Sequence, residues 1–140
     1  MGGFSVLLVD NEPTTSDRIY HGLSDQGLAI RRARSRAQTL SEIKKKDIDV
    51  VLLDLMIAGT DGIALLREIK TMDPLVEVIL LANQANPSIA VQGIKLGAFD
   101  FLFKSVEIDD LFHKLQDAHQ KKVIQEEKIE KIRHCADEDK

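Results

Sequence analysis

VLLDLMIAGTDG, residues 51–62, sets a carboxylate, Asp54, directly after an unbroken apolar run. A continuous run of Val and Leu is typical of a strand that is covered on both faces, as in a parallel sheet. Gly59 and Gly62 follow in the next loop, and a stretch with helical spacing comes after them, so we expect a tight loop and a helix start. Asp54 would then lie at the carboxyl end of a rigid, buried strand.

Similar apolar runs recur along the chain and alternate with stretches of helical periodicity. We expect five strands, at residues 4–9, 28–33, 50–53, 76–81 and 99–103. Helix-spaced apolar residues, with glycine or proline at their ends, predict helices between these strands. This alternation predicts a doubly wound, three-layer α/β domain of the (βα)5 type with a parallel sheet.

The last helix differs from the others because nothing breaks it from Val106 to about Arg133, which is about 42 Å at 1.5 Å per residue. Its first half is amphipathic and should pack on the sheet, whereas its second half is highly charged. A heptad pattern of apolar residues continues into that half but is interrupted at Lys122 and Gln125. We expect a domain at residues 1–118 and a charged extension at 119–140, which acts as a linker, acts as a dimerisation helix or frays.

Composition excludes several classes of protein. The net charge of −4 gives no overall attraction to nucleic acid or to membranes, so we expect no direct nucleic-acid binding and no membrane contact. The run RRARSR, residues 31–36, could bind phosphate, but we favour an edge strand whose charges discourage edge-to-edge pairing. A single cysteine, Cys135, the absence of a signal peptide and the lack of a long apolar segment predict a cytoplasmic protein.

Three charged residues fall at predicted strand ends, and they could form one site. Asp10 follows the first strand, Asp54 the third and Lys104 the fifth. Ligands of open α/β sheets bind beyond the carboxyl ends of the strands, where these side chains would converge if their strands are near neighbours. Two carboxylates suit Mg²⁺, and a lysine opposite them suits a phosphoryl group. Taken singly, each residue could instead be a helix cap or a solvated surface residue.

The chain resembles the receiver domains of bacterial two-component response regulators over roughly residues 4–118. The matching stretches are VLLVDNEP, VVLLDLMIAGTDGIALLREIK, VEVILLANQ and AVQGIKLGAFDFLFKS. The resemblance implies a flavodoxin-like fold with strand order 2-1-3-4-5. It also implies that Asp54 accepts a phosphoryl group from a histidine kinase or a phosphotransfer protein, so that the chain is a phosphoacceptor and not a conventional enzyme. Mg²⁺ would be held by Asp10, Asn11, Asp54 and the backbone carbonyl of Met56, and Lys104 would pair with the phosphoryl oxygens.

The chain departs from the family pattern around this site. Asn11 replaces a second acid, which should weaken Mg²⁺ binding, although Glu12 could compensate if its side chain reaches the pocket. Ala82 replaces the Ser or Thr that couples the phosphoryl group to an aromatic switch residue, at Phe101 here, so that switch should be weakened. We expect the neighbouring Asn83 to point to the other side of its strand. Ser105 replaces a cis-proline after Lys104, which predicts a trans bond. Ala58 replaces a proline of the loop after Asp54.

Three hypotheses follow. The first is a phosphorylatable receiver that switches protein interactions. The second is a phosphorylation-independent interaction module, which forms a dimer through its fourth helix, fifth strand and fifth helix. The third is another α/β class, an aspartate-based phosphatase or a flavin binder. The phosphatase has Glu12 where a second Asp is usual, and the flavin binder lacks a glycine loop around Asp10.

Overall fold

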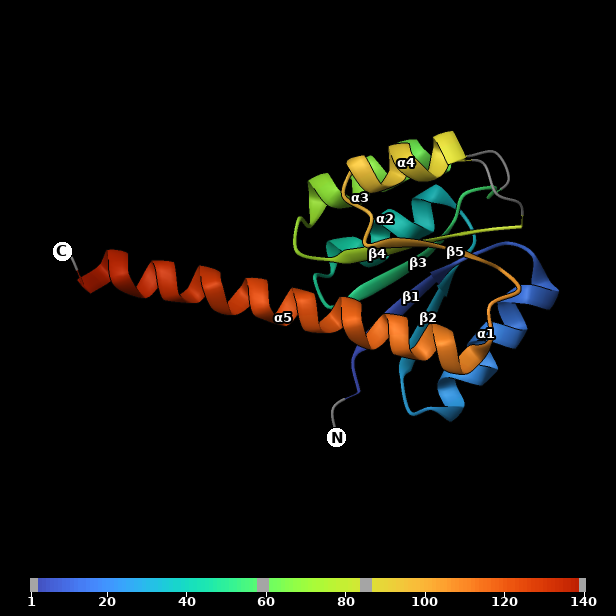
Figure 1. Cartoon of the computed structure of the whole chain (residues 1–140), viewed down its shortest axis with the longest axis horizontal. Coiled ribbons are helices and arrows are strands. Elements are labelled where there is room, and N and C mark those ends of the chain that lie inside the picture. Colours follow the sequence, from blue (N-terminus) through green and yellow to red (C-terminus); the bar gives the residue numbers. More distant parts are fainter. Residues whose placement is uncertain (1–2, 58–60, 84–86, 139–140) are drawn as a thin grey trace.

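The computed structural model describes residues 3–57, 61–83 and 87–138, which form one five-stranded parallel sheet with helices on both faces (Figure 1). The strands are β1 (Ser5–Val9), β2 (Ala29–Ala33), β3 (Val50–Asp54), β4 (Glu77–Ala82) and β5 (Asp100–Phe103). The helices are α1 (Pro13–Asp25), α2 (Arg36–Lys44), α3 (Gly62–Met72), α4 (Pro87–Lys95) and α5 (Ile108–Glu138). The sheet order is β2-β1-β3-β4-β5, so the expected doubly wound, flavodoxin-like fold is confirmed.

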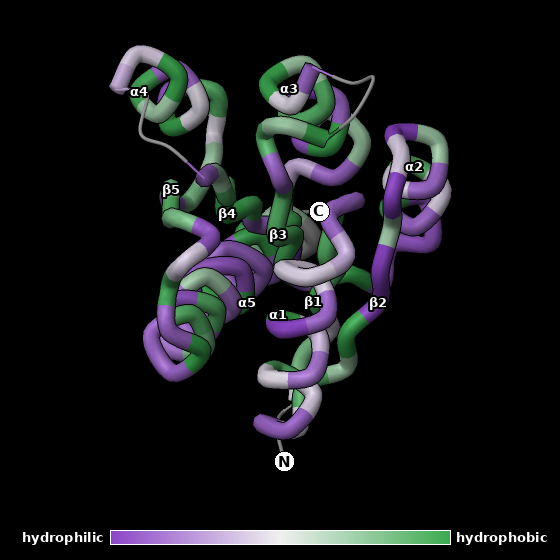
Figure 2. The backbone as a smooth tube through the Cα atoms, turned by 90° about the vertical axis from the view of Figure 1, so that its right-hand side faces the viewer, coloured by the Kyte–Doolittle hydropathy of each residue, from purple (hydrophilic) through white to green (hydrophobic). Residues whose placement is uncertain are grey.

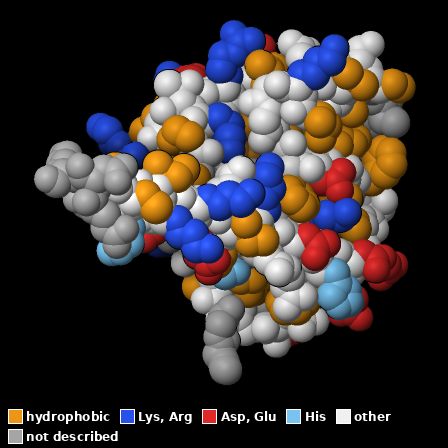
Figure 3. All heavy atoms as spheres, turned by 60° about the vertical axis from the view of Figure 1, so that its left-hand side comes forward, with side chains coloured by type: hydrophobic (Ala, Val, Ile, Leu, Met, Phe, Trp, Pro, Cys, Tyr) orange, Lys and Arg blue, Asp and Glu red, His pale blue; other side chains and the backbone are white. Residues whose placement is uncertain are grey.

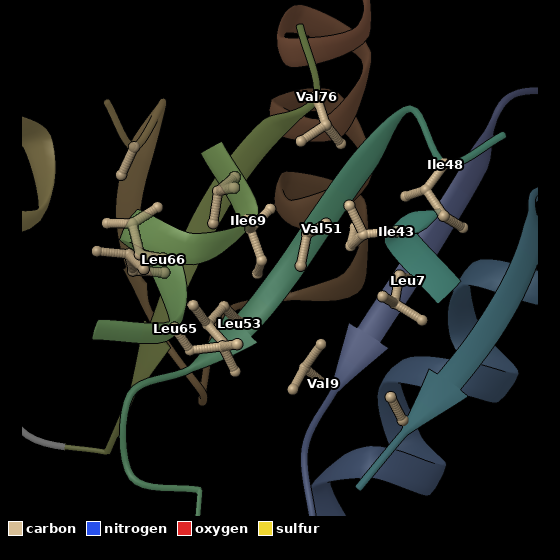
Figure 4. Close-up of a cluster of buried hydrophobic side chains, with 14 of the residues drawn as sticks. Leu7, Val9, Ile43, Ile48, Val51, Leu53, Leu65, Leu66, Ile69 and Val76 are labelled. Carbon is tan, nitrogen blue, oxygen red and sulfur yellow. The ribbon is translucent and has the colours of Figure 1, made fainter. Parts of the chain in front are cut away.

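Both faces of the sheet are covered, which explains the continuous apolar strands. Successive side chains along each strand point to opposite faces of the sheet. Leu7 and Val51 lie on the face covered by α2 and α3, whereas Val6 and Leu52 lie on the face covered by α1 and α5. Figure 4 shows the first of these two layers, where strand residues meet Leu66 and its neighbours on α3. In the tube view, hydrophobic segments line the middle of the molecule between the two helical layers (Figure 2). This packing makes the carboxyl ends of the strands a rigid platform.

The first half of the arginine-rich run, residues 31–33, belongs to β2, which lies at the edge of the sheet as predicted, whereas Arg36 begins α2. Arg31 is paired with Glu42 and Asp47, and Arg32 is paired with Asp17. These charges therefore have protein partners, which agrees with the structural interpretation of the run and not with a phosphate-binding patch.

Helix α5 begins at Ile108, two residues later than expected, because Val106 N–H bonds to the carbonyl of Phe103 in a turn. The helix packs on the sheet through the buried residues Leu111, Leu115 and Ala118. Lys122 then pairs with Asp49 at 2.7 Å, and beyond this point the helix projects from the body as far as Glu138 (Figure 1). The helix thus extends past its predicted end.

Length alone would let α5 cross a bilayer, but it carries too many charges. No helix in the described part of the chain is both long enough and apolar enough to cross a membrane.

Gly62 lets the start of α3 approach the segment that follows Asp54. A Cβ atom at this position would lie 2.7 Å from the backbone Cα and O of Leu55. Asp61 caps the helix by accepting from Ile63 N–H at 3.0 Å. The glycine predicted at the helix start therefore has a steric reason and sets how α3 lies against the end of β3. Gly59 lies outside the described residues.

We expect Gly62→Ala to lower the free energy of unfolding by about 1–3 kcal/mol, because backbone atoms of Leu55 would have to move. Urea unfolding measures this loss. Gly93→Ala is the comparison, since the nearest atom to its Cβ would be Cδ1 of Leu80, the far end of a side chain that can change rotamer, and not backbone. Equal effects of the two substitutions would contradict this reading of Gly62.

Candidate functional site

The three charged residues predicted at strand ends meet in one buried site. The ammonium nitrogen of Lys104 lies 2.8 Å from Asp54 Oδ2 and 3.6 Å from Asp10 Oδ2. All three residues are almost fully buried. Strand β4 separates β3 from β5, so the long side chain of Lys104 extends across the end of β4 to reach the carboxylates. The predicted convergence of these side chains is therefore confirmed.

Glu12 brings a third carboxylate to the site, in the position considered from the sequence. Its Oε2 atom lies 3.2 Å from the Lys104 ammonium, and its Oε1 atom accepts a hydrogen bond from the Thr15 hydroxyl at 2.9 Å. The bond from Thr15, with those from Lys104 and Asn83, holds the pKa of Glu12 below its ordinary value of 4.5. Glu12 therefore stays ionised beside Lys104.

The hydrogen bond between Asn83 and Glu12 corrects the expectation that Asn83 points away from the site. Strand β4 ends at Ala82, so the strict alternation of side chains along a strand does not apply one residue later. Asn83 lies in a bend, where the chain can turn its side chain toward Glu12.

Asp10 has a buried carboxylate oxygen that accepts no hydrogen bond from the described residues. Its Oδ1 atom accepts from Glu12 N–H at 2.7 Å, whereas its buried Oδ2 atom has no hydrogen-bond partner among the described residues. Burial raises the pKa of Asp10, and this effect outweighs the opposing bond from Glu12 N–H and the charge of Lys104. A buried carboxylate oxygen that accepts no hydrogen bond, and whose nearest cation is the Lys104 ammonium at 3.6 Å, is suited to binding a further cation.

The carboxylates of the site stabilise the charged form of Lys104. Burial by itself lowers the pKa of Lys104, but the hydrogen bond to Asp54 and the charges of Asp10 and Asp54 outweigh it and raise the pKa above 10.5. The Lys104 side chain is therefore protonated at neutral pH. Three carboxylates face this one cation, so negative charge is in excess in the site.

The remaining predicted residues lie around this centre. Asn11 follows Asp10 and is half-buried, while Met56 donates its N–H to Asp54 Oδ1 at 2.9 Å and exposes its side chain. Ala82 is buried at the end of β4, where its methyl group cannot donate a hydrogen bond. Phe101 packs against the core layer under α2 and α3, and its ring meets Phe103 edge-on at 6.0 Å. Ala58 lies outside the described residues.

Ser105 follows Lys104 through a trans peptide bond, as expected, since no peptide bond in the described ranges is cis. No group of three or more His, Cys, Asp or Glu side chains in those ranges forms a metal cluster. A metal ion here would thus need ligands besides carboxylates, such as amide and backbone oxygens.

The chain is thus a doubly wound α/β domain with two buried aspartates and a buried lysine at the carboxyl edge of a 2-1-3-4-5 sheet. The family model described as "Response regulator receiver domain" matches residues 6–116. This chain belongs to that family, the receiver domains of two-component systems.

Similar proteins of known sequence include larger regulators. Transcriptional regulatory protein ZraR of Escherichia coli K12 is 32% identical over 113 residues, which are 81% of this chain and 26% of that protein. Nitrogen assimilation regulatory protein NtrX of Azorhizobium caulinodans is 36% identical over 108 residues, 76% of this chain and 24% of that protein. The chain thus spans about a quarter of the length of these relatives.

Solved structures show the same fold. The crystal structure of the NtrX receiver domain from Brucella abortus has a TM-score of 0.78 and 33% identity, and the match covers 82% of this chain and 98% of that one. A receiver domain from Clostridium thermocellum gives a TM-score of 0.82 and 30% identity, with coverage of 87% and 98%.

We expect Asp10→Asn to raise the free energy of unfolding at pH 7 by about 1–3 kcal/mol, because it removes one buried charge from a site in which three carboxylates share one ammonium. The amide keeps the shape of the side chain and removes its charge. Urea unfolding over a range of pH measures the effect. Asp17→Asn is the control, because the bond from Arg32 lowers the pKa of that exposed carboxyl; this variant should gain nothing.

The pH dependence of this effect has a definite sign. The pKa of Asp10 is raised in the folded protein, so protonation of this side chain stabilises the fold. That stabilisation is fully present below pH 3.8, the ordinary pKa of an aspartate. That stability is lost as the pH rises through the higher folded value. The advantage of Asp10→Asn should be largest above this window and disappear below pH 3.8. Equal stability of the variant and the wild type at pH 7 would contradict this account.

Proposed function

We propose that this receiver is phosphorylated on Asp54 by a histidine kinase or a phosphotransfer protein, in a reaction that depends on Mg²⁺. The observation that carries the proposal is the buried contact of 2.8 Å between Asp54 Oδ2 and the Lys104 ammonium, beside Asp10 Oδ2, which accepts no hydrogen bond. Such a contact joins an oxygen nucleophile to a cation that can bind the incoming anion.

The chemistry assigned to these residues is phosphoryl transfer. A carboxylate oxygen of Asp54 forms a bond to phosphorus while the bond from phosphorus to the donor's imidazole nitrogen breaks, which leaves an acyl phosphate on Asp54. Lys104 turns its ammonium toward the phosphoryl oxygens and offsets their charge. Transfer of this kind needs mainly positioning and charge neutralisation, both of which a rigid strand end and a buried lysine supply.

Asp10, Asn11, Asp54 and the backbone carbonyl of Met56 are the residues that we propose as the Mg²⁺ site. The excess negative charge of the site, and the Asp10 oxygen that accepts no hydrogen bond, fit a hard divalent cation. The cation, when bound, would neutralise phosphoryl charge and orient the transfer. Asn11 offers a neutral oxygen where an acid is usual in the family, so binding should be weaker than in receivers with two acids.

The response to phosphorylation should differ from the usual one at Ala82 and Phe101. Ala82 has no hydroxyl with which to bond a phosphoryl oxygen, and Phe101 already packs inward. We therefore propose that Ala82 and Phe101 form a weakened switch and that signalling depends more on the charged residues of the site.

We propose that residues 1–118 form the receiver and that the rest of α5 links or dimerises it. Its projecting part exposes Ile129 and Ile132, and the face of α4 and β5 exposes Val91, Ile94 and Phe103. Figure 3 shows hydrophobic side chains among lysines and arginines on the side from which α5 projects. A homodimer through α4, β5 and α5 would cover part of this surface.

The similar regulators ZraR and NtrX suggest a regulatory output for this receiver. The kinase would meet the receiver in the cytoplasm.

We expect incubation with acetyl phosphate and Mg²⁺ to add one phosphoryl group to the wild-type protein and none to Asp54→Ala, since Asp54 is the proposed nucleophile. Intact-mass spectrometry measures the addition. Asp110→Ala, which removes an exposed aspartate of α5, is the control and should be labelled like the wild type. A wild-type protein that stays unlabelled, beside a reacting control receiver, would overturn the proposal.

We expect Asn11→Asp to raise the Mg²⁺ affinity about tenfold, because hard-cation binding increases with ligand charge. The half-saturating Mg²⁺ concentration for labelling, and calorimetric titration without donor, both report this change. Gln92→Glu adds the same charge on the exposed surface of α4 and should leave the affinity unchanged. An unaltered affinity in Asn11→Asp would remove Asn11 from the site.

A further inference from the structure

Arg18 joins helix α1 to the loop that follows β5. Its guanidinium donates hydrogen bonds to two backbone carbonyls, that of Lys104 and that of Val106, the latter at 3.1 Å. These residues are more than 80 positions away in the sequence. The contact therefore ties a loop of the proposed phosphorylation site to a helix on the other side of that site.

The two carbonyls bonded by Arg18 lie on either side of Ser105. The loop is otherwise held by Lys104 N–H, which bonds to the carbonyl of Ala82 at 2.9 Å, and by the turn between Val106 and Phe103. Serine does not lock φ as proline does, so Ser105 itself restrains the backbone of the loop little. A planar guanidinium with several fixed donors can fasten two carbonyls at once.

The same end of α1 also holds the tip of the lysine side chain. Glu12, the residue that precedes Pro13, contacts the Lys104 ammonium at 3.2 Å, and Thr15 fixes the Glu12 carboxylate. Glu12, at the N-cap of α1, thus contacts the Lys104 ammonium, and Arg18, in the first two turns of the same helix, binds the Lys104 backbone carbonyl. The Lys104 side chain is buried and its ammonium is in contact with Asp54 and Glu12, so it has little freedom to compensate for a shift of its backbone.

We propose that Arg18 is a positioning residue for Lys104. By fastening the carbonyls on both sides of Ser105 to α1, it fixes the backbone from which Lys104 reaches Asp54. For its effect on phosphoryl transfer, this inference rests on the function proposed above. Its structural part, the restraint of the loop at residues 104–106, stands on the two hydrogen bonds alone.

The first test is the rate of labelling by acetyl phosphate at saturating Mg²⁺. Arg18→Gln should slow labelling about tenfold or more, as expected when hydrogen bonds from a charged donor are lost. The half-saturating Mg²⁺ concentration should stay unchanged, because Arg18 touches none of the proposed ligands. Arg18→Lys should restore part of the rate. Arg67→Gln, the same change at an exposed arginine of α3, is the matched control. A wild-type rate in Arg18→Gln would overturn the proposal.

The second test separates positioning from general stability. In a Lys104→Ala background, Arg18→Gln should have no further effect on the labelling rate, because the group that it positions is gone. If the two substitutions instead slow labelling independently, so that their effects multiply, Arg18 does not act through Lys104 and the proposal fails.

The third test does not depend on phosphorylation. Amide hydrogen exchange at Val106, whose N–H bonds to the Phe103 carbonyl at 3.0 Å, should become about tenfold faster in Arg18→Gln and stay unchanged in Arg67→Gln. Faster exchange in a protein that acetyl phosphate does not label would support the tether and refute the proposed function. Unchanged exchange would refute the tether whether or not the protein is labelled.

Discussion

The ammonium group of Lys104 is the interaction on which the site depends. A buried cation and buried carboxylates are tolerated only because they are paired, and removal of one partner would leave the other uncompensated. The pairing draws together the ends of β1, β3 and β5 and the start of α1, through Asp10, Asp54 and Glu12. Because three carboxylates share one ammonium, the site keeps an excess of negative charge, which a divalent cation would offset.

The core and the site follow different constraints. Both faces of the sheet are packed with aliphatic side chains, so the strand ends form a fixed frame that tolerates unusual residues at its edge. The departures from the family lie at this edge, at Asn11, Ala82 and Ser105. Glu12 and Arg18 add contacts to Lys104 at the same place.

The sequence predicts the features that rest on local patterns. Unbroken apolar runs reveal the strands, and charged residues at their ends reveal the convergence of Asp54 with Lys104. The hydrogen bonds of Arg18 could not be predicted, because they join segments far apart in the chain and arginine on a helix surface has no distinguishing pattern. The orientation expected for Asn83 is wrong because strand alternation ends at Ala82. The sequence does not mark the end of α5, because its charged half contains neither glycine nor proline.

The most direct test of the account is to locate the phosphoryl group after labelling with acetyl phosphate. Borohydride reduces an acyl phosphate of aspartate to homoserine, which peptide mass spectrometry can place at a single residue. The account predicts homoserine at position 54 and at no other position. Reduction at Asp10 or at another acid, or a phosphorylated protein in which no aspartate is reduced, would contradict it.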